Sequence, residues 1–325
     1  MCTSIIYSSN NHYFGRNLDL EVTFGQKVVV MPRNYKIKMK RVNDIENHYA
    51  IVGMAAVEDG FPLFFDAANE KGLGMAGLAY ADRATYMPAK EDKKNIASFE
   101  LIPYILGQCE NIAQVKELLD DINVDDDQFS KQFPPSPLHW LLADKTGASL
   151  TLEPDKDGLH YYDNPVGVLT NVPEFPKQLI NLSNYATVSP AQPKNTLVPN
   201  TDIDLYSRGM GTHFLPGGMD SESRFVKVAF TLQHAPKGKD NIEDITNYFH
   251  IMQAIAQPKG LDEVAPNTFE YTIYTDCTDL EHGVYYYTTY ENNQITAIDM
   301  NKTDLDGSVL TTYQARQKQE IAYEN

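Results

Sequence analysis

Cys2 is the residue with the clearest chemical potential, because it directly follows Met1. A small second residue permits removal of the initiator methionine, which would leave Cys2 with a free α-amine beside its thiol. A thiol with a pKa of about 8.5 and an α-amine with a pKa of about 7.7 to 8.0 both titrate near neutrality, so they can exchange a proton. Cys2 is therefore a candidate nucleophile that carries its own base. The alternative is a small apolar residue that opens a buried strand.

A cation and a carboxylate follow in the stretch 14–19, Phe-Gly-Arg-Asn-Leu-Asp. Antiparallel pairing after a turn would bring this stretch back beside Cys2, where Arg16 could lower the pKa of the thiol and Asp19 could hold the α-ammonium. Residues three apart point to opposite faces of a regular strand, so we expect the backbone to bend at Gly15. The alternative is an exposed Arg and a turn Asp, which is the commoner fate of both residue types.

Three further segments offer groups for a site. Residues 167–171 form an apolar run that ends at Asn171, whose amide could donate to an oxyanion. Arg224 stands among apolar residues and would need a partner if it were buried. The glycine-rich segment 69–80 allows close approach of a ligand to the backbone. It has neither the Lys-Ser/Thr ending of a P-loop nor GxGxxG spacing, so phosphate binding is weakly supported.

The elements that must position these groups are strands at both ends of the chain. Apolar, β-branched and aromatic runs predict strands at 3–7, 13–14, 27–31, 269–275, 284–290 and 294–299. Residues 8–11 suit a hairpin turn between the first two of these strands, and residues 291–293 suit a turn between the last two.

Two helices are predicted between the terminal strands. Asn111 and Gln114 resemble a capping box, and an apolar stripe follows at Ile112, Val115, Leu118, Leu119 and Ile122. A second stripe ends before Pro258 and consists of Ile242, Ile245, Phe249, Met252 and Ile255. Antiparallel strands with helices on their outer faces imply a layered α+β architecture. No repeat or linker divides the chain, so we expect one domain over residues 1–325.

Composition excludes several classes of protein. Hydrophobic residues make up 42% and charged residues 22% of the 325 residues, as is typical of globular proteins. The formal net charge of −17 argues against nucleic acid as a partner, because phosphates would be repelled. No apolar stretch is long enough for a membrane span, and no signal peptide is recognised, so we expect a cytoplasmic protein.

Cysteine and histidine spacing argue against disulfides and metals. The three cysteines form an odd, widely spaced set without a CxxC pair, and the eight histidines include no pair at helix-face spacing. We therefore expect no metal and no cofactor.

As an ordered set, these segments identify a family. The chain resembles the choloylglycine hydrolases, the N-terminal-nucleophile amidases that comprise conjugated bile salt hydrolases and penicillin V acylases. The resemblance runs nearly end to end and rests on Cys-Thr-Ser at 2–4, FGRNLD at 14–19, NEKGL at 69–73, SPLHW at 136–140, DNPVGVLTN at 163–171, YSRGMG at 206–211, LPGG at 215–218, SRF at 223–225 and YTIY at 271–274.

The resemblance implies a four-layer αββα sandwich of antiparallel sheets and a homotetramer. It implies Cys2 as nucleophile with its α-amine as base and later acid, Asp19 and Arg16 as the groups that tune it, Asn171 as an oxyanion donor, and Arg224 as a polarising group. The family usually has Asn (bile salt hydrolases) or Tyr (penicillin V acylases) where this chain has Ala79. If that position donates through its backbone N–H, Ala preserves catalysis; if its side chain selects the substrate, the chain fits neither branch. Val172 departs from the family as well, because an Asn is common there in bile salt hydrolases.

The implied substrate is a bile acid conjugated to glycine or taurine. Leu18, Val22, Phe24, Phe61, Phe129 and Phe133 are candidate walls of an apolar acyl pocket, although ordinary packing explains each equally well. Arg208 is a candidate partner for a sulfonate or carboxylate, which favours taurine conjugates. The alternatives are a penicillin V acylase and a non-catalytic steroid- or lipid-binding protein, and retention of Met1 would favour the latter.

Overall fold

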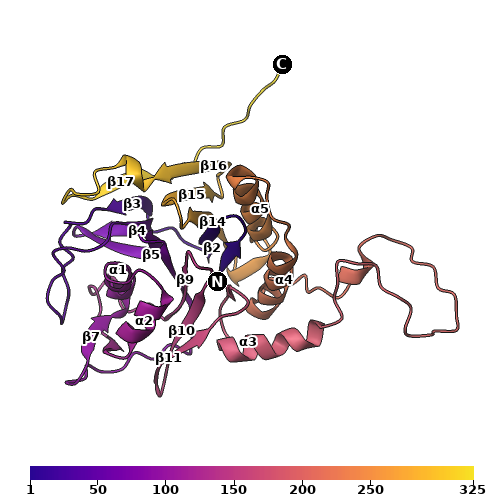
Figure 1. Cartoon of the computed structure of the whole chain (residues 1–325), viewed down its shortest axis with the longest axis horizontal. Coiled ribbons are helices and arrows are strands. Elements are labelled where there is room, and N and C mark those ends of the chain that lie inside the picture. The colour runs from indigo at the N-terminus through magenta and orange to yellow at the C-terminus, as the bar shows by residue number, and fades with distance from the viewer.

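The computed structural model describes residues 1–325 and places most strands in two antiparallel sheets that pack face to face (Figure 1). Sheet A has the order β12 (Val168–Leu169), β1 (Cys2–Ser8), β2 (His12–Leu20), β14 (Thr268–Asp279), β15 (Val284–Thr289) and β16 (Asn292–Asp299), with β13 (Asp262–Ala265) paired to β14. Sheet B has the order β11 (Gly158–Asp163), β10 (Ser149–Asp155), β9 (Leu138–Asp144), β6 (Leu73–Ala79), β5 (Phe61–Asn69), β4 (Ile51–Glu58), β3 (Lys27–Met31) and β17 (Thr311–Gln314).

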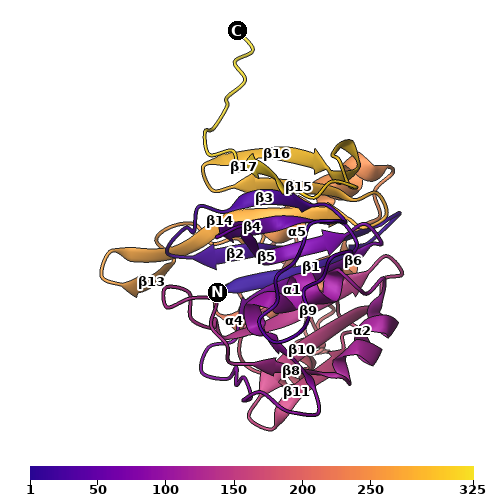
Figure 2. The same ribbon diagram turned by 90° about the vertical axis from the view of Figure 1, so that its left-hand side faces the viewer.

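Helices cover the outer face of each sheet, which confirms the four-layer αββα sandwich (Figures 1 and 2). Sheet B is covered by α1 (Leu101–Leu106) and α2 (Ile112–Leu119), beside a small parallel pair formed by β7 (Lys94–Ala97) and β8 (Ile122–Asp125). Sheet A is covered by α4 (Ser221–His234) and α5 (Asn241–Gln253). The fifth helix, α3 (Phe175–Leu182), lies against α4. None of these helices is long and apolar enough to cross a bilayer.

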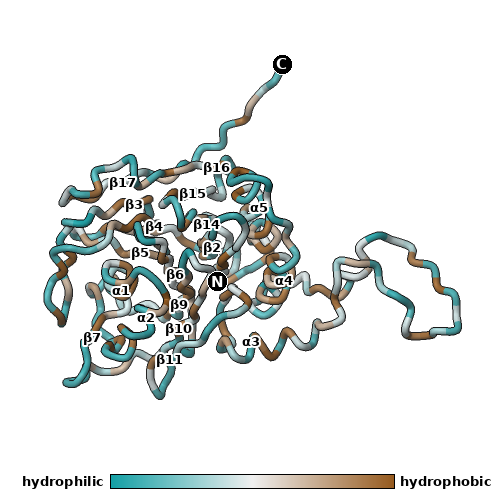
Figure 3. Tube along the Cα trace, viewed as in Figure 1, coloured by the Kyte–Doolittle hydropathy of each residue, from teal (hydrophilic) through white to brown (hydrophobic).

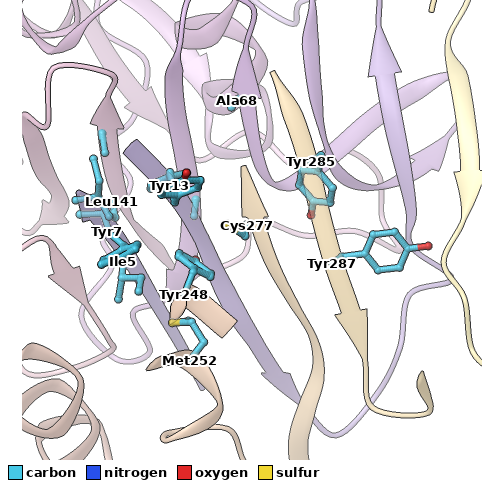
Figure 4. Packing of buried hydrophobic residues seen from close by; sticks show 14 of the residues in the cluster. Ile5, Tyr7, Tyr13, Ala68, Leu141, Tyr248, Met252, Cys277, Tyr285 and Tyr287 are labelled. Atoms are coloured by element: carbon cyan, nitrogen blue, oxygen red, sulfur yellow. The ribbon is translucent and has the colours of Figure 1, made fainter. Parts of the chain in front are cut away.

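Alternating side chains divide the core into two layers. In β3, Val28 and Val30 belong to the core that lies between the sheets and under α4 and α5, whereas Val29 and Met31 belong to the core under α1 and α2. This period of two is expected of a strand that is buried on both faces. Figure 4 shows part of the first core, where Ile5 and Tyr7 lie near Tyr248, Met252 and Cys277. Figure 3 shows that hydrophobic stretches, in brown, recur along the inner strands.

The first predicted hairpin is confirmed, since β1 and β2 pair from Cys2–Leu18 to Ser8–His12. The last hairpin is also present, but β16 begins at Asn292, so its turn is shorter than predicted. The strand predicted at 269–275 extends to Asp279.

Both predicted helices are shorter than their apolar stripes. Ile122 was wrongly placed on the first helix: α2 ends at Leu119, and Ile122 begins β8, where it is buried beside Lys94. In the second helix, Ile242 is exposed in the first turn of α5, and Ile255 lies beyond its end. Tyr248, which the stripe omitted, completes the buried face of α5.

Residues 183–220, between α3 and α4, form a long segment, here called the extension, most of which projects from the body of the molecule (Figure 1). The extension contains only two short 3₁₀ turns, Ser183–Tyr185 and Met210–Thr212. Short hydrophobic stretches interrupt its hydrophilic chain (Figure 3).

Candidate active site

Cys2 is the first residue of β1 and is 3% exposed. It pairs with Leu18, so the antiparallel hairpin brings the end of β2 beside it, as the turn at residues 8–11 predicts. The expected bend at Gly15 is absent, because β1 and β2 pair regularly through this residue. The irregularity in the sheet lies in β14, opposite Leu18 and Asp19, and Gly15 instead permits close approach to Asp276, whose carbonyl oxygen would stand 2.3 Å from a Cβ.

Arg224 joins the strand of Cys2 to the neighbouring elements. Its Nη1 donates to the carbonyl oxygen of Cys2 at 2.6 Å and to Oγ1 of Thr3 at 2.5 Å. Its Nη2 donates to Oδ1 of Asn171 at 2.7 Å, and its Nε donates to the carbonyl oxygen of Met219 at 2.8 Å. The side chain is fully buried, and burial lowers the pKa of the guanidinium, while the charge of Asp19 opposes that shift.

Asn171 follows β12 and connects the two sheets. Its Oδ1 accepts from the backbone nitrogen of Cys2 at 2.9 Å, and its Nδ2 donates to the carbonyl oxygen of Ala79 at 2.8 Å. Its own backbone nitrogen donates to Oγ of Ser221 at 2.9 Å. The amide is therefore fixed in one orientation, with its donor beside the end of β6 and its acceptor on Cys2.

Asp19 is fully buried behind Cys2, and burial raises the pKa of its carboxyl group. Its Oδ1 accepts from Oγ1 of Thr272 at 2.6 Å. Its Oδ2 has no hydrogen-bond partner and lies 4.0 Å from Nη1 of Arg224. A buried carboxylate oxygen without a partner costs free energy, so Oδ2 is available to accept a hydrogen bond from a nearby donor.

Met1 is present in this chain, and its amino group lies next to Asp19. The amino group donates to the carbonyl oxygen of Asp19 at 2.8 Å and forms an ion pair with the carboxylate of Glu270. Burial lowers the pKa of this ammonium group. In this form the nitrogen of Cys2 is a peptide N–H, so removal of Met1 is what would convert it into an amine, held at the same place by Asn171.

Arg16 reaches from sheet A to sheet B. Its Nη1 donates to the carbonyl oxygens of Phe65, at 3.2 Å, and Gly77, and its Nη2 has no acceptor. Burial opposes the charge on Arg16, but attraction to Cys2 and to the acidic groups behind it raises its pKa overall. The guanidinium therefore keeps its positive charge beside the sulfur atom. Among those acidic groups, burial raises the pKa of Asp66 and of Asp276.

An apolar cavity of about 310 Å³ opens beside Cys2. Its lining includes Cys2, Arg16, Leu18, Phe24, Ala79, Phe129 and Phe133 among the residues singled out from the sequence. The structure does not place Val22, Phe61 or Arg208 on this lining. Val22 is half-exposed after β2, and Phe61 packs behind the wall against Phe99 and Phe129, at ring distances of 5.5 and 5.8 Å. Arg208 lies on the extension.

Four residues of this region were missed by the sequence analysis. Thr272 donates a hydrogen bond to Asp19, and Ser221 accepts one from the backbone of Asn171. Glu270 forms an ion pair with the amino group of Met1, and Trp140 lines the cavity. Thr272 and Trp140 fall in the YTIY and SPLHW motifs, so those motifs were the available signal for them. Nothing in the sequence pattern marks Glu270. No group of three or more His, Cys, Asp or Glu side chains is arranged to hold a metal ion.

Comparisons with known proteins agree with this geometry. Residues 2–313 match the family described as linear amide C–N hydrolases, choloylglycine hydrolase family. A bile salt hydrolase/transferase from Lactiplantibacillus plantarum is 46% identical over 316 residues, which cover 97% of each chain. A bile salt hydrolase/transferase from Clostridium perfringens is 36% identical over 331 residues, which cover both chains fully.

Solved structures give the same result for the fold. The crystal structure of a variant of the conjugated bile acid hydrolase from Clostridium perfringens superposes with a TM-score of 0.93 at 36% identity, over 100% of both chains. Penicillin V acylase from Agrobacterium tumefaciens gives a TM-score of 0.77 at 19% identity, over 96% of this chain and 91% of that one, which shows a shared fold alone. The fold is that of the N-terminal-nucleophile hydrolases, and the chain belongs to the choloylglycine hydrolase family of linear amide C–N hydrolases.

Proposed function

We propose that this enzyme hydrolyses the amide bond between a bile acid and glycine or taurine. The observation that carries the proposal is the position of Cys2, which stands beside an apolar cavity with its nitrogen held by Asn171. The relatives named bile salt hydrolase/transferase support the substrate class, because they match this chain over nearly its whole length.

The apolar lining of the cavity suits a steroid acyl group. Fifteen of its 22 lining residues are hydrophobic, so burial of an apolar ring system is favourable there. Cys2 and Arg16 bring a nucleophile and a positive charge to this lining, so the amide to be cleaved must lie beside them. Cys2 and Arg16 thus match the amide of a conjugated bile acid, and the apolar walls match its ring system.

In the proposed mechanism, removal of Met1 frees the α-amine of Cys2 as the general base. The amine takes the thiol proton, and the sulfur attacks the amide carbonyl to give a tetrahedral intermediate. The amine then returns the proton to the leaving nitrogen of glycine or taurine, which leaves a thioester on Cys2. A water molecule, deprotonated by the same amine, hydrolyses the thioester and releases the bile acid.

The surrounding groups match the charges that arise in these steps. Asp19, with its unpartnered Oδ2, would hold the α-ammonium, and Arg16 would stabilise the thiolate. Asn171 Nδ2 and the backbone N–H of Ala79 would stabilise the oxyanion, as donors in comparable sites do. For Asn171 this requires that the oxyanion replace the carbonyl of Ala79 as its acceptor. Because the proposed donor at position 79 is a backbone group, Ala suffices there.

Assembly as a homotetramer in the reducing cytoplasm is part of the proposal. The extension carries large apolar side chains that an isolated subunit leaves in water, including Leu197, 87% exposed, and Phe214, 75% exposed. Cys2, Cys109 and Cys277 are all unpaired, which suits a reducing compartment. Light scattering tests the assembly: we expect the mass of four subunits, and a dimer or monomer would exclude it.

One assay tests the proposed function. The purified protein is incubated with taurocholate, glycocholate and penicillin V, and release of free amine is measured beside the intact mass. We expect a mature chain without Met1 that cleaves both bile salts, whereas Cys2→Ala and Cys2→Ser should lose activity and the matched Cys109→Ala should keep it. Cleavage of penicillin V alone would reassign the substrate, and silence on all three substrates would exclude hydrolysis of either class.

A further inference from the structure

The peptide unit that precedes the side chain of Asn171 is held at both of its polar groups. Its carbonyl oxygen, which belongs to Thr170, lies 3.0 Å from Nε2 of His139. Its N–H, which belongs to Asn171, donates to Oγ of Ser221 at 2.9 Å. Because a peptide unit is planar, these two contacts fix its plane and the Cα from which the amide of Asn171 projects. The position of this proposed oxyanion donor therefore depends in part on His139.

The imidazole ring of His139 is fixed in one orientation. The ring is fully buried and stacks on Tyr80, with centroids 4.5 Å apart and planes inclined by 9°. Its Nδ1 lies 3.2 Å from Oε1 of Glu153. A carbonyl oxygen can only accept, so Nε2 carries a hydrogen and donates it to Thr170, whichever of Nδ1 and Oε1 holds the proton between them.

Glu153 extends this hold to the far end of the segment 170–175. Its carboxylate accepts from the backbone nitrogen of Phe175, with Oε1 at 3.0 Å and Oε2 at 3.2 Å. Glu153 and His139 are both fully buried, so water does not compete for these contacts. The pair therefore ties two points, one on each side of Asn171, to strands β10 and β9.

The backbone of His139 lies beside the second proposed oxyanion donor. In sheet B, His139 of β9 pairs with Leu78 of β6, and the preceding Leu138 pairs with Ala79. The main chain of His139 thus belongs to the pairing that places Ala79, while its side chain holds the peptide unit that places Asn171. One residue relates the two groups, although they come from different sheets.

We propose that His139 is a positioning residue, which holds the amide of Asn171 in register with the backbone N–H of Ala79 so that both stabilise one oxyanion. The inference rests on the proposed function, because it takes these two groups as the oxyanion donors. His139 is absent from the lining of the cavity, so it acts through Asn171 and not on the substrate. Its loss should therefore slow the chemical step and leave binding of the acyl group unchanged.

Two substitutions separate the hydrogen bond from the packing. His139→Gln keeps an N–H near the place of Nε2, whereas His139→Met fills similar space without a donor. Both lose the contact with Glu153, so the donor to Thr170 is what distinguishes them. For His139→Met we expect kcat with taurocholate to fall by about 10- to 100-fold and KM to stay within about twofold. His139→Gln should recover most of kcat, and equal kcat in the two variants, or a change in KM alone, would overturn the inference.

Two further variants guard this comparison. If His139→Met does not fold, the double variant with Glu153→Gln takes its place, since it removes the buried charge and keeps an acceptor for Phe175. The same fall in kcat is expected of it. The control is His160→Met on β11, where the imidazole is partly exposed and pairs with Asp157. It should have the kinetics of wild type, and an equal loss in this control would contradict a specific role of His139.

Crystal structures of the two single variants test the geometry without any assay. The distance from Nδ2 of Asn171 to the carbonyl oxygen of Ala79, 2.8 Å here, should lengthen in His139→Met and persist in His139→Gln. An unchanged distance in His139→Met would contradict the positioning role. If wild type hydrolyses no conjugate, the proposed function fails, whereas this distance still decides whether His139 places Asn171.

Discussion

Oδ1 of Asn171 accepts the hydrogen bond of the backbone nitrogen of Cys2 at 2.9 Å. The same side chain donates to Ala79 across the gap between the sheets, at 2.8 Å. The nucleophile on sheet A and the end of β6 on sheet B are therefore set relative to each other by one amide group. A side chain that fixes both partners in this way controls where the carbonyl of a substrate can lie.

Replacing Asn171 by Ala should lower kcat strongly. The change removes both the acceptor that holds Cys2 and the proposed oxyanion donor, and loss of one such donor costs about 10² to 10³ in turnover. Steady-state kinetics with taurocholate measures the effect. Asn184→Ala, an exposed Asn of the extension, is the matched control and should behave as wild type. A fall of less than tenfold in Asn171→Ala would speak against a catalytic role.

Arg224→Lys should keep the positive charge but lose activity. A lysine ammonium lacks the planar fork that contacts Cys2, Thr3 and Asn171 together, so the geometry of the site loosens. A misplacement of about 1 Å can cost 10²-fold, and we expect a fall in kcat of about that size. The control is Arg83→Lys, at a half-exposed ion pair with Glu174. Unchanged kinetics in Arg224→Lys would show that charge alone suffices.

Thr272→Val should move the acid limb of the pH–rate profile to higher pH. The hydroxyl of Thr272 donates to Asp19 and lowers the pKa of its carboxyl group, against the upward effect of burial. Without this bond Asp19 takes up its proton at a higher pH, and the proposed hold on the α-ammonium is lost there. Profiles of kcat/KM between pH 4 and 8 measure the shift. A shift in the opposite direction, or the same shift in the control Thr246→Val on α5, would refute this reading.

Glu100 should make the protein less stable as the pH rises towards neutrality. Burial raises the pKa of its carboxyl group to about 7, although the backbone nitrogens of Ala97 and Lys40 donate to it. Between the ordinary pKa of Glu, about 4.3, and pH 7, the unfolded chain binds fewer protons than the folded one, so the free energy of unfolding falls. Above about pH 7 the contribution is constant.

Glu100→Gln does not titrate and so isolates this contribution. Thermal unfolding of both proteins at pH 5, 6, 7 and 8 should show the Tm of wild type, relative to that of Glu100→Gln, decreasing from pH 5 to 7 and levelling off towards pH 8. A constant difference between the two proteins would mean that Glu100 titrates at its ordinary pKa.

The hairpin and the layers could be predicted from the sequence because both depend on local patterns. The turn at residues 8–11 sets the register that returns Asp19 to Cys2, and the apolar stripes identify the helices. Helix ends were less accurate because periodicity alone does not separate a helix from a buried strand. Ile122 continues the stripe of α2 and yet begins β8.

The rest of the site depends on contacts between distant segments. The bulge between Thr272 and Tyr274 breaks the alternation of β14, so the sequence does not show that Thr272 faces Asp19. Val22 and Phe61 belong to the right neighbourhood, but which side chains reach a cavity is decided by packing between loops. Arg208 stands on the extension, whose course has no periodic pattern to predict it.

The partners of Cys2 lie far apart along the chain, and this spacing has a consequence for biosynthesis. The sulfur atom leaves the ribosome among the first residues, whereas α4 with Arg224 and β14 with Thr272 are made in the last third of the chain. A nascent or truncated polypeptide that lacks them presents an ordinary cysteine. The complete site can therefore assemble only after synthesis of the chain is nearly finished.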